Sequence, residues 1–223
     1  MNMSPINRQM ASTLAGRLPV VTEPLSQAAE SIRGLRTHIV ARHIGAGRRA
    51  LSVCAPNKDA GTTFVAANLA AALAQAGMST LLVDADMRSP GVARAFGCDE
   101  AAPGLKQYLS GTGAGDFAEI VSSSVPGLSL LLSGGVASNA QELLAGPRFR
   151  ALIDACTRDY QFMIVDAPPA SQYADAGLIA HVVSYCLVVA RRNATYVSDM
   201  NVLIRQLRAD NAVVVGTILN SGP

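Results

Sequence analysis

Short apolar runs alternate along the chain with longer alanine- and leucine-rich segments. The runs are typical of buried strands, and the longer segments favour helices that cover them. Strands are predicted near residues 50–55, 80–84, 128–132, 161–166, 184–190 and 212–218. Helices are predicted near residues 63–76, 140–157, 173–181 and 196–209, and an earlier helix, with Ser26 as its candidate N-cap, ends near residue 43. This alternation predicts an α/β fold with a doubly wound, mostly parallel sheet.

Length and composition favour one large domain. Apolar residues make up 50% of the 223 residues, which is enough for a sizeable core. Residues 19–223 show no repeat and no dividing linker, so we expect a single domain there. Residues 1–18 are mixed and polar, and we expect a flexible segment and no signal peptide. The longest apolar run, residues 177–190, is too short to span a bilayer, which favours a cytoplasmic protein.

The net charge and the cysteines exclude two further classes of function. A formal net charge of +2 is too small to make nucleic acid the expected partner. The cysteines lack the C-x-x-C spacing of a metal site and are expected to be reduced thiols. They are Cys54, Cys98, Cys156 and Cys186.

The segment between the first predicted strand and the next helix has the context of a phosphate-binding loop. Gly61 and Thr63 match the glycine and the magnesium-binding hydroxyl of the G-K-[ST] pattern, but Thr62 stands where the lysine belongs. The N–H groups at the start of the helix still favour an anion, whereas the lysine charge on the β- and γ-phosphates is absent from its usual place. Lys58 is either a replacement that folds back over the phosphates or an exposed loop lysine. Taken alone, the segment is also compatible with a plain strand-to-helix turn.

Three carboxylates follow buried strands. Asp84 and Asp86 end the strand near residues 80–84, and Asp166 ends the strand near residues 161–166. In an open parallel sheet, ligands bind beyond the carboxyl ends of the strands, so we expect the three to converge on the loop. Clustered carboxylates at a phosphate site suit Mg²⁺. A single aspartate in such a place is more often a cap or turn residue, but three beside this loop favour a site.

Four further motifs are spread along the chain. They are residues 83–90 (VDADMRSP), 164–169 (IVDAPP), 30–36 (ESIRGLR) and 139–144 (NAQELL). These motifs resemble those of the bacterial tyrosine kinases (BY-kinases), which belong with the deviant P-loop ATPases of cell division and plasmid partition. The similarity extends over about residues 20–220 and implies a P-loop NTPase-like fold and a role in exopolysaccharide synthesis and export.

The resemblance also implies roles for individual residues, with Mg²⁺ and ATP or ADP as the cofactors. In an active enzyme Asp84 would be the base near a tyrosine hydroxyl, and Asp86, Asp166 and Thr63 would hold Mg²⁺ directly or through water. Asn220 follows the last predicted strand, where relatives place an adenine contact, although a cap or turn role fits it equally well. The implied nucleotide-binding residues are Gly61, Thr62, Thr63 and Asn220.

The same resemblance implies partners. Glu30, Arg33 and Arg36 recur at three-residue spacing, which by periodicity alone favours a solvated helix face. In the family, this motif joins subunits, so the resemblance implies an interface in a homo-oligomer. It further implies a separate membrane co-polymerase, whose cytoplasmic segment would hold the chain peripheral to the inner membrane.

Departures from the family pattern separate three interpretations. Thr62 replaces the lysine, residues 56–60 are unlike the family's P-G-E-G, and no tyrosine-rich tail follows Tyr196. These losses favour a pseudokinase with weak or no use of ATP. An active tyrosine autokinase is the first alternative, because the carboxylates are retained. A positioning ATPase comes last, because Asn57 stands where such proteins carry a second lysine.

Overall fold

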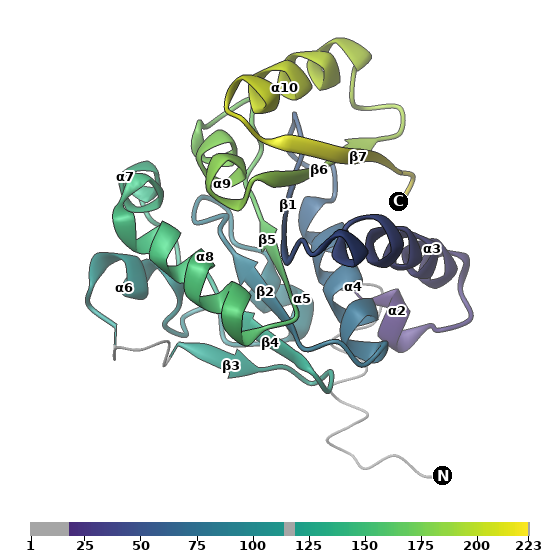
Figure 1. Cartoon of the computed structure of the whole chain (residues 1–223), viewed down its shortest axis with the longest axis horizontal. Coiled ribbons are helices and arrows are strands. Elements are labelled where there is room, and N and C mark those ends of the chain that lie inside the picture. Colours follow the sequence, from purple (N-terminus) through teal and green to yellow (C-terminus); the bar gives the residue numbers. More distant parts are fainter. Residues whose placement is uncertain (1–17, 114–118, 223) are drawn as a thin grey trace.

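A mostly parallel sheet forms the middle layer of the computed structural model, which describes residues 18–113 and 119–222 (Figure 1). The strand order is β3-β4-β2-β5-β1-β6-β7, and neighbouring strands are parallel except for the antiparallel pair β3–β4 at one edge. This confirms the predicted doubly wound sheet. The strands are β1 (Ala50–Cys54), β2 (Thr80–Asp84), β3 (Ile120–Ser122), β4 (Leu128–Leu131), β5 (Phe162–Asp166), β6 (Tyr185–Arg191) and β7 (Val213–Asn220).

Helices cover both faces of the sheet, and each face has its own apolar core. One face carries α2 (Pro19–Thr22), α3 (Gln27–Arg42), α4 (Thr62–Gln75) and α5 (Val92–Phe96), with the short 3-10 helix η1 (Ile44–Ala46) after α3. The other carries α6 (Leu105–Ser110), α7 (Ala140–Ala145), α8 (Pro147–Asp159), α9 (Asp175–Val183) and α10 (Val197–Ala209).

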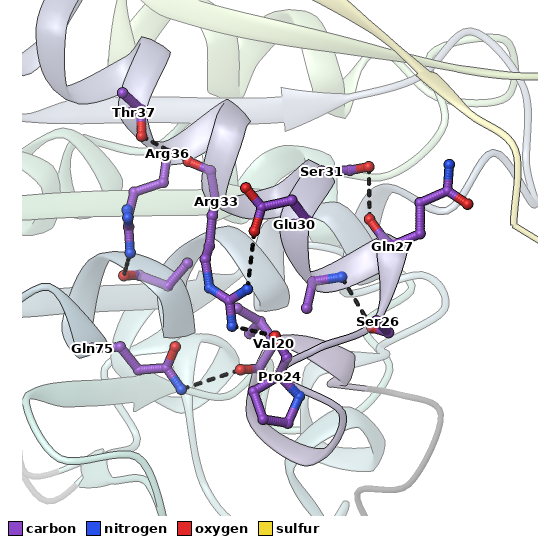
Figure 2. Close-up of polar contacts among 12 residues, drawn as sticks. Val20, Pro24, Ser26, Gln27, Glu30, Ser31, Arg33, Arg36, Thr37 and Gln75 are labelled. Carbon is purple, nitrogen blue, oxygen red and sulfur yellow. Dashed lines mark hydrogen bonds and ion pairs between the residues drawn. The ribbon is translucent and has the colours of Figure 1, made fainter.

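The central helix α4 explains the alanine-rich segment of the sequence. Ten of its residues, from Val65 to Ala74, are buried, because α4 lies between the sheet and α3. Small side chains allow both neighbours to approach the helix backbone closely. Ser26 caps α3 as predicted, since its Oγ accepts a hydrogen bond of 3.2 Å from the Ala29 N–H (Figure 2).

The structure corrects the predicted elements in two ways. The helix expected near residues 140–157 is two helices, because Gly146 is extended and Pro147 begins α8. Proline lacks an N–H and disfavours the helical conformation in the residue before it. The four short elements α2, α5, α6 and β3 were not predicted, since three to six residues are too few to show a period.

The chain ends were also the subject of predictions. The flexible segment expected at residues 1–18 lies outside the described residues except for Leu18, which is buried. Within the described residues, no helix combines the length and the apolar character that crossing a membrane requires. The single domain expected over residues 19–223 stays a prediction.

Candidate functional site

The loop between β1 and α4 ends in a left-handed glycine at the start of the helix. Gly61 is the N-cap of α4 and has a left-handed conformation, with φ 86° and ψ 32°. A Cβ at this position would collide with Nδ2 of Asn220, which donates a hydrogen bond of 2.9 Å to the Ala60 carbonyl. The left-handed conformation therefore favours glycine, and a Cβ would also displace the Asn220 side chain from its hydrogen bond.

The threonine hydroxyl predicted as a metal ligand lies beside the predicted carboxylate. Oγ1 of Thr63 donates to Oδ2 of Asp166 at 2.6 Å. Thr62 is the first residue of α4 and is partly exposed, so the position of the missing lysine is in the first turn of the helix. Lys58 is exposed on the loop, which agrees with the interpretation of it as an exposed loop lysine.

Two of the carboxylates meet at the ends of neighbouring strands. Asp84 on β2 and Asp166 on β5 are register partners, and both side chains are fully buried. Oδ2 of Asp84 accepts hydrogen bonds from the N–H groups of Gly91 (3.2 Å) and Val92 (3.0 Å). Oδ1 of Asp84 and Oδ1 of Asp166 are buried without a hydrogen-bond partner. Two orphaned carboxylate oxygens at one edge of the sheet are a costly arrangement that a bound cation would relieve.

The third carboxylate, Asp86, organises the turn that follows. Its Oδ1 accepts the N–H groups of Arg88 (3.0 Å) and Ser89 (2.9 Å). The Arg88 guanidinium turns towards the buried Asp175, with Nε 2.9 Å from Oδ2, and also donates to the Ser138 carbonyl. Asp86 therefore holds the turn through backbone N–H groups, whereas the Arg88 side chain pairs with Asp175; the Asp86 carboxylate is almost buried.

Burial dominates the electrostatics of these groups. It raises the pKa of Asp84 to about 7, against hydrogen bonds from Val92 and Gly91 that lower it. Burial, together with the charge of Asp84, raises the pKa of Asp166 well above its ordinary value. Burial also raises the pKa of Asp86. Neighbouring buried carboxyls are costly to ionise together, which favours protonation or a bound cation.

The donor set fits Mg²⁺ that is shared with phosphate. In the described part of the chain, no three His, Cys, Asp or Glu side chains are arranged to hold a metal ion by themselves. Mg²⁺ usually keeps several waters and binds one or two carboxylates together with substrate phosphates. The Thr63 hydroxyl and the orphaned oxygens of Asp166 and Asp84 suit that mode of binding.

Two residues that the sequence analysis missed hold the loop from outside. Nη1 of Arg191 donates to the Asp59 carbonyl at 2.8 Å, and Oδ2 of Asp199 accepts from Nδ2 of Asn57 at 2.9 Å. Arg191 is the last residue of β6, at the same carboxyl-end edge as the aspartates. The rule that ligands bind at this edge was a signal that could have identified Arg191.

The three residues of the predicted interface contact their own chain (Figure 2). Arg33 donates to Oε2 of Glu30 (3.2 Å) and to the Pro24 carbonyl (2.6 Å). Arg36 donates to the Ala72 carbonyl near the end of α4, at 3.5 Å. The Glu30 side chain is 78% exposed, so an acidic group remains available to a neighbour. The interface itself stays a prediction.

An apolar groove of about 790 Å³ lies beside the loop. It extends along α3 and is bounded by the start of α4 and by β7. Asn220, whose side chain donates a hydrogen bond to the loop carbonyl of Ala60, lies in its lining. Its main apolar lining residues are Ile32, Leu35, Phe64, Val215 and Ile218.

Comparisons with known proteins agree with this geometry, although no protein-family model matches the chain. The tyrosine-protein kinase wzc of Salmonella typhi is 32% identical over 209 residues, 92% of this chain and 28% of wzc, so the chain spans about a quarter of that relative. The crystal structure of the chimerical protein CapA2B2 has a TM-score of 0.85 at 30% identity, covering 92% of this chain and 89% of that chain. The septum site-determining protein MinD of Pyrococcus horikoshii, complexed with Mg-ADP, has a TM-score of 0.66 at 25% identity, covering 77% of this chain and 70% of MinD.

The raised pKa of Asp84 predicts an unusual dependence of stability on pH. The folded state holds this proton up to about pH 7, whereas the unfolded chain releases it near 3.8. The unfolded state therefore binds fewer protons in this window, and the free energy of unfolding falls as pH rises from about 4 to 7. Without divalent cations, Asp84→Asn should raise that free energy by about 2–4 kcal/mol at pH 8 and change it little at pH 4.

Urea unfolding at both pH values measures this effect. Asp154→Asn is the control, because it removes one carboxylate from an exposed position on α8. Equal changes in the two variants, or a less stable Asp84→Asn protein at pH 8, would contradict the predicted cost of the buried charge.

Proposed function

The chain belongs to the bacterial tyrosine kinase family, and on that premise we propose that it is a degenerate member with weak or no use of ATP, acting in exopolysaccharide synthesis and export. The observation that carries the proposal is Thr62 in the first turn of α4, where the family pattern has lysine. The loop shape, the threonine hydroxyl and the buried carboxylates remain around it. The chain thus keeps the other parts of the site but lacks the positive charge of the lysine.

Electrostatics support the weak use of ATP. The β- and γ-phosphates would lie beside Asp84, Asp86 and Asp166, which oppose their charge unless they are protonated or bound to Mg²⁺. The N-terminus of α4 offsets only part of this, with about half a positive charge. From the effect of removing single electrostatic donors in other enzymes, loss of the lysine costs about 3–4 kcal/mol of transition-state stabilisation. Mg²⁺ with ATP or ADP is the proposed ligand, and MinD, which shares the fold, was crystallised with Mg-ADP.

An active autokinase is the second candidate, favoured by the state of Asp84. One oxygen of its carboxylate is orphaned, and its pKa is about 7, which suits a general base that takes a tyrosine proton near neutral pH. In this role Mg²⁺ would supply charge neutralisation, held by Thr63, Asp166 and Asp86. A positioning ATPase has less support, because Asn57 occupies the place of the extra lysine of such proteins.

Partners complete the proposal. Family membership supports a homo-oligomer, with α3 at the contact, and a membrane co-polymerase whose cytoplasmic segment holds the chain peripheral to the inner membrane. Arg33 and Arg36 are held by backbone carbonyls of their own chain, so the charged face of α3 is ordered before any partner binds. Such preorganisation lowers the entropy lost on association.

The first prediction from this proposal concerns nucleotide affinity. Calorimetry with Mg-ATP should show a Kd weaker than about 100 μM for the natural chain, because only backbone groups, the helix dipole and Mg²⁺ attract the phosphates. Thr62→Lys should bind at least about tenfold more tightly, and Thr62→Met controls for side-chain length without charge. Micromolar binding of Mg-ATP by the natural chain would contradict the proposal. If Thr62→Lys does not bind Mg-ATP more tightly, the defect lies in residues 56–60.

The second prediction concerns phosphoryl transfer. With radiolabelled Mg-ATP we expect no appreciable label on the tyrosines, even when the cytoplasmic segment of the membrane partner is present. The lysine is absent, and the five tyrosines are scattered. They are Tyr108, Tyr160, Tyr173, Tyr185 and Tyr196.

A label that disappears in Asp84→Asn and Asp166→Asn would instead establish the autokinase. Polymer export in a deletion strain separates the two functions further. Rescue by an Asp84→Asn gene is expected of a scaffold, whereas an enzyme that depends on Asp84 would not rescue.

The third prediction concerns assembly. Replacing both Arg33 and Arg36 by alanine should shift a sedimentation profile from oligomer towards monomer, because bidentate pairing with a neighbour is lost. Arg42→Ala, at an exposed position in the last turn of α3, is the control for charge. Thermal unfolding must accompany the measurement, since both arginines also brace their own chain. If the natural chain is monomeric at high concentration, the assembly prediction is wrong and these residues form a solvated helix face.

A further inference from the structure

We infer that Arg191 and Asn220 are positioning residues that hold the phosphate loop in its binding shape, and that Asn220 does this instead of contacting the nucleotide base. The inference rests on the proposed function for the identity of the ligand, which is a phosphate chain with Mg²⁺. The shape of the loop itself is a property of the protein without ligand.

Two consecutive carbonyls of the loop are held by these residues. Nη1 of Arg191 donates to the Asp59 carbonyl at 2.8 Å, and Nδ2 of Asn220 donates to the Ala60 carbonyl at 2.9 Å. The other end of the Asn220 amide is engaged as well, because its Oδ1 accepts the N–H of Gly222 at 3.1 Å. Both the Nδ2 and the Oδ1 atoms of Asn220 are therefore hydrogen-bonded within the protein.

The loop needs such support because its backbone is strained. Asp59 has a φ of 60°, a left-handed conformation that costs a non-glycine residue about 1 kcal/mol or more. Gly61, two residues later, is left-handed as well. The first half of the loop is held from another side, since the carbonyls of Ala55 and Pro56 accept N–H groups of the segment after β5.

Holding the carbonyls from outside leaves the amides for a ligand. Residues 58 and 59 form a turn, and among the described residues the N–H groups of Asn57, Lys58, Asp59 and Gly61 donate to no protein acceptor. Successive backbone N–H groups in alternating right- and left-handed conformations form anion-binding concavities, and the N-terminus of α4 adds its dipole. The hydrogen bonds that hold the loop carbonyls (the clamp) therefore leave the loop amides available to bind an anion.

The clamp is anchored rigidly. Arg191 is the last residue of β6 and Asn220 the last of β7, and the two are register partners. The Arg191 N–H donates to Oγ1 of Thr195 at 2.9 Å, and the Arg192 N–H donates to the Asn220 carbonyl at 2.8 Å. Since β6 also pairs with β1, which leads into the loop, the clamp and the loop belong to one piece of sheet.

The first test measures the loop without ligand. Backbone order parameters from ¹⁵N relaxation should be about 0.85 for residues 57–61 of the natural chain and should fall below about 0.6 in Arg191→Ala and in Asn220→Ala. Arg191→Lys should retain order, because an ammonium can still donate to the Asp59 carbonyl. Arg192→Ala, an exposed neighbour with the same loss of charge, should change nothing. Unchanged order in both clamp variants would overturn the inference.

The second test separates clamping from base recognition. In the Thr62→Lys protein, Asn220→Ala should weaken binding of Mg-ATP, Mg-GTP and Mg-tripolyphosphate by a similar factor of about fivefold or more, since one hydrogen bond to the loop is lost. A loss confined to Mg-ATP would overturn the inference and make Asn220 an adenine contact. Failure of Thr62→Lys to bind any of the three would place the binding defect in residues 56–60, as in the affinity test above, while the relaxation test still decides the clamp.

Discussion

The burial of two like-charged carboxyls at the ends of adjacent strands is the constraint on which the rest of the site depends. Asp84 and Asp166 are register partners on β2 and β5, and neither has access to water. Burial raises the pKa of both carboxyls, the charge of Asp84 adds to the rise at Asp166, and each carboxyl leaves one oxygen without a partner. A carboxylate that only caps a turn can remain at the surface, so the burial of this pair supports the proposal that the site receives a cation.

The shape of the phosphate loop does not depend on the missing lysine. The shape of the loop comes from Gly61 and from carbonyls held by other segments, and none of these contacts involves residue 62. A lysine at that position adds charge to a loop whose form is already set. A chain that has lost the lysine can therefore retain the fold, the acidic pair and the loop, and still differ sharply from its relatives in what it does with nucleotide.

In helix α3, the motif proposed for assembly also braces the folded chain. Arg36 donates to the carbonyl of Ala72, near the negative end of α4, and Arg33 closes the turn at Pro24. The Arg36 contact ties α3 to the helix that begins at the loop, and the Arg33 contact ties α3 to the segment before it.

The sequence by itself determined the long elements and the chemistry of the strand ends. Apolar runs predicted every strand except β3, and the positions of Gly61, Thr63, Asp84 and Asp166 in the site were predicted because residue type and place at a strand end are local properties. Only the tertiary structure decided which groups meet. Arg191 and Asp59 lie 132 positions apart, and Asp199 and Asn57 lie 142 apart. Their contacts depend on β6 lying beside β1 in one register, and that register is set by the packing of the whole sheet, which no local pattern records.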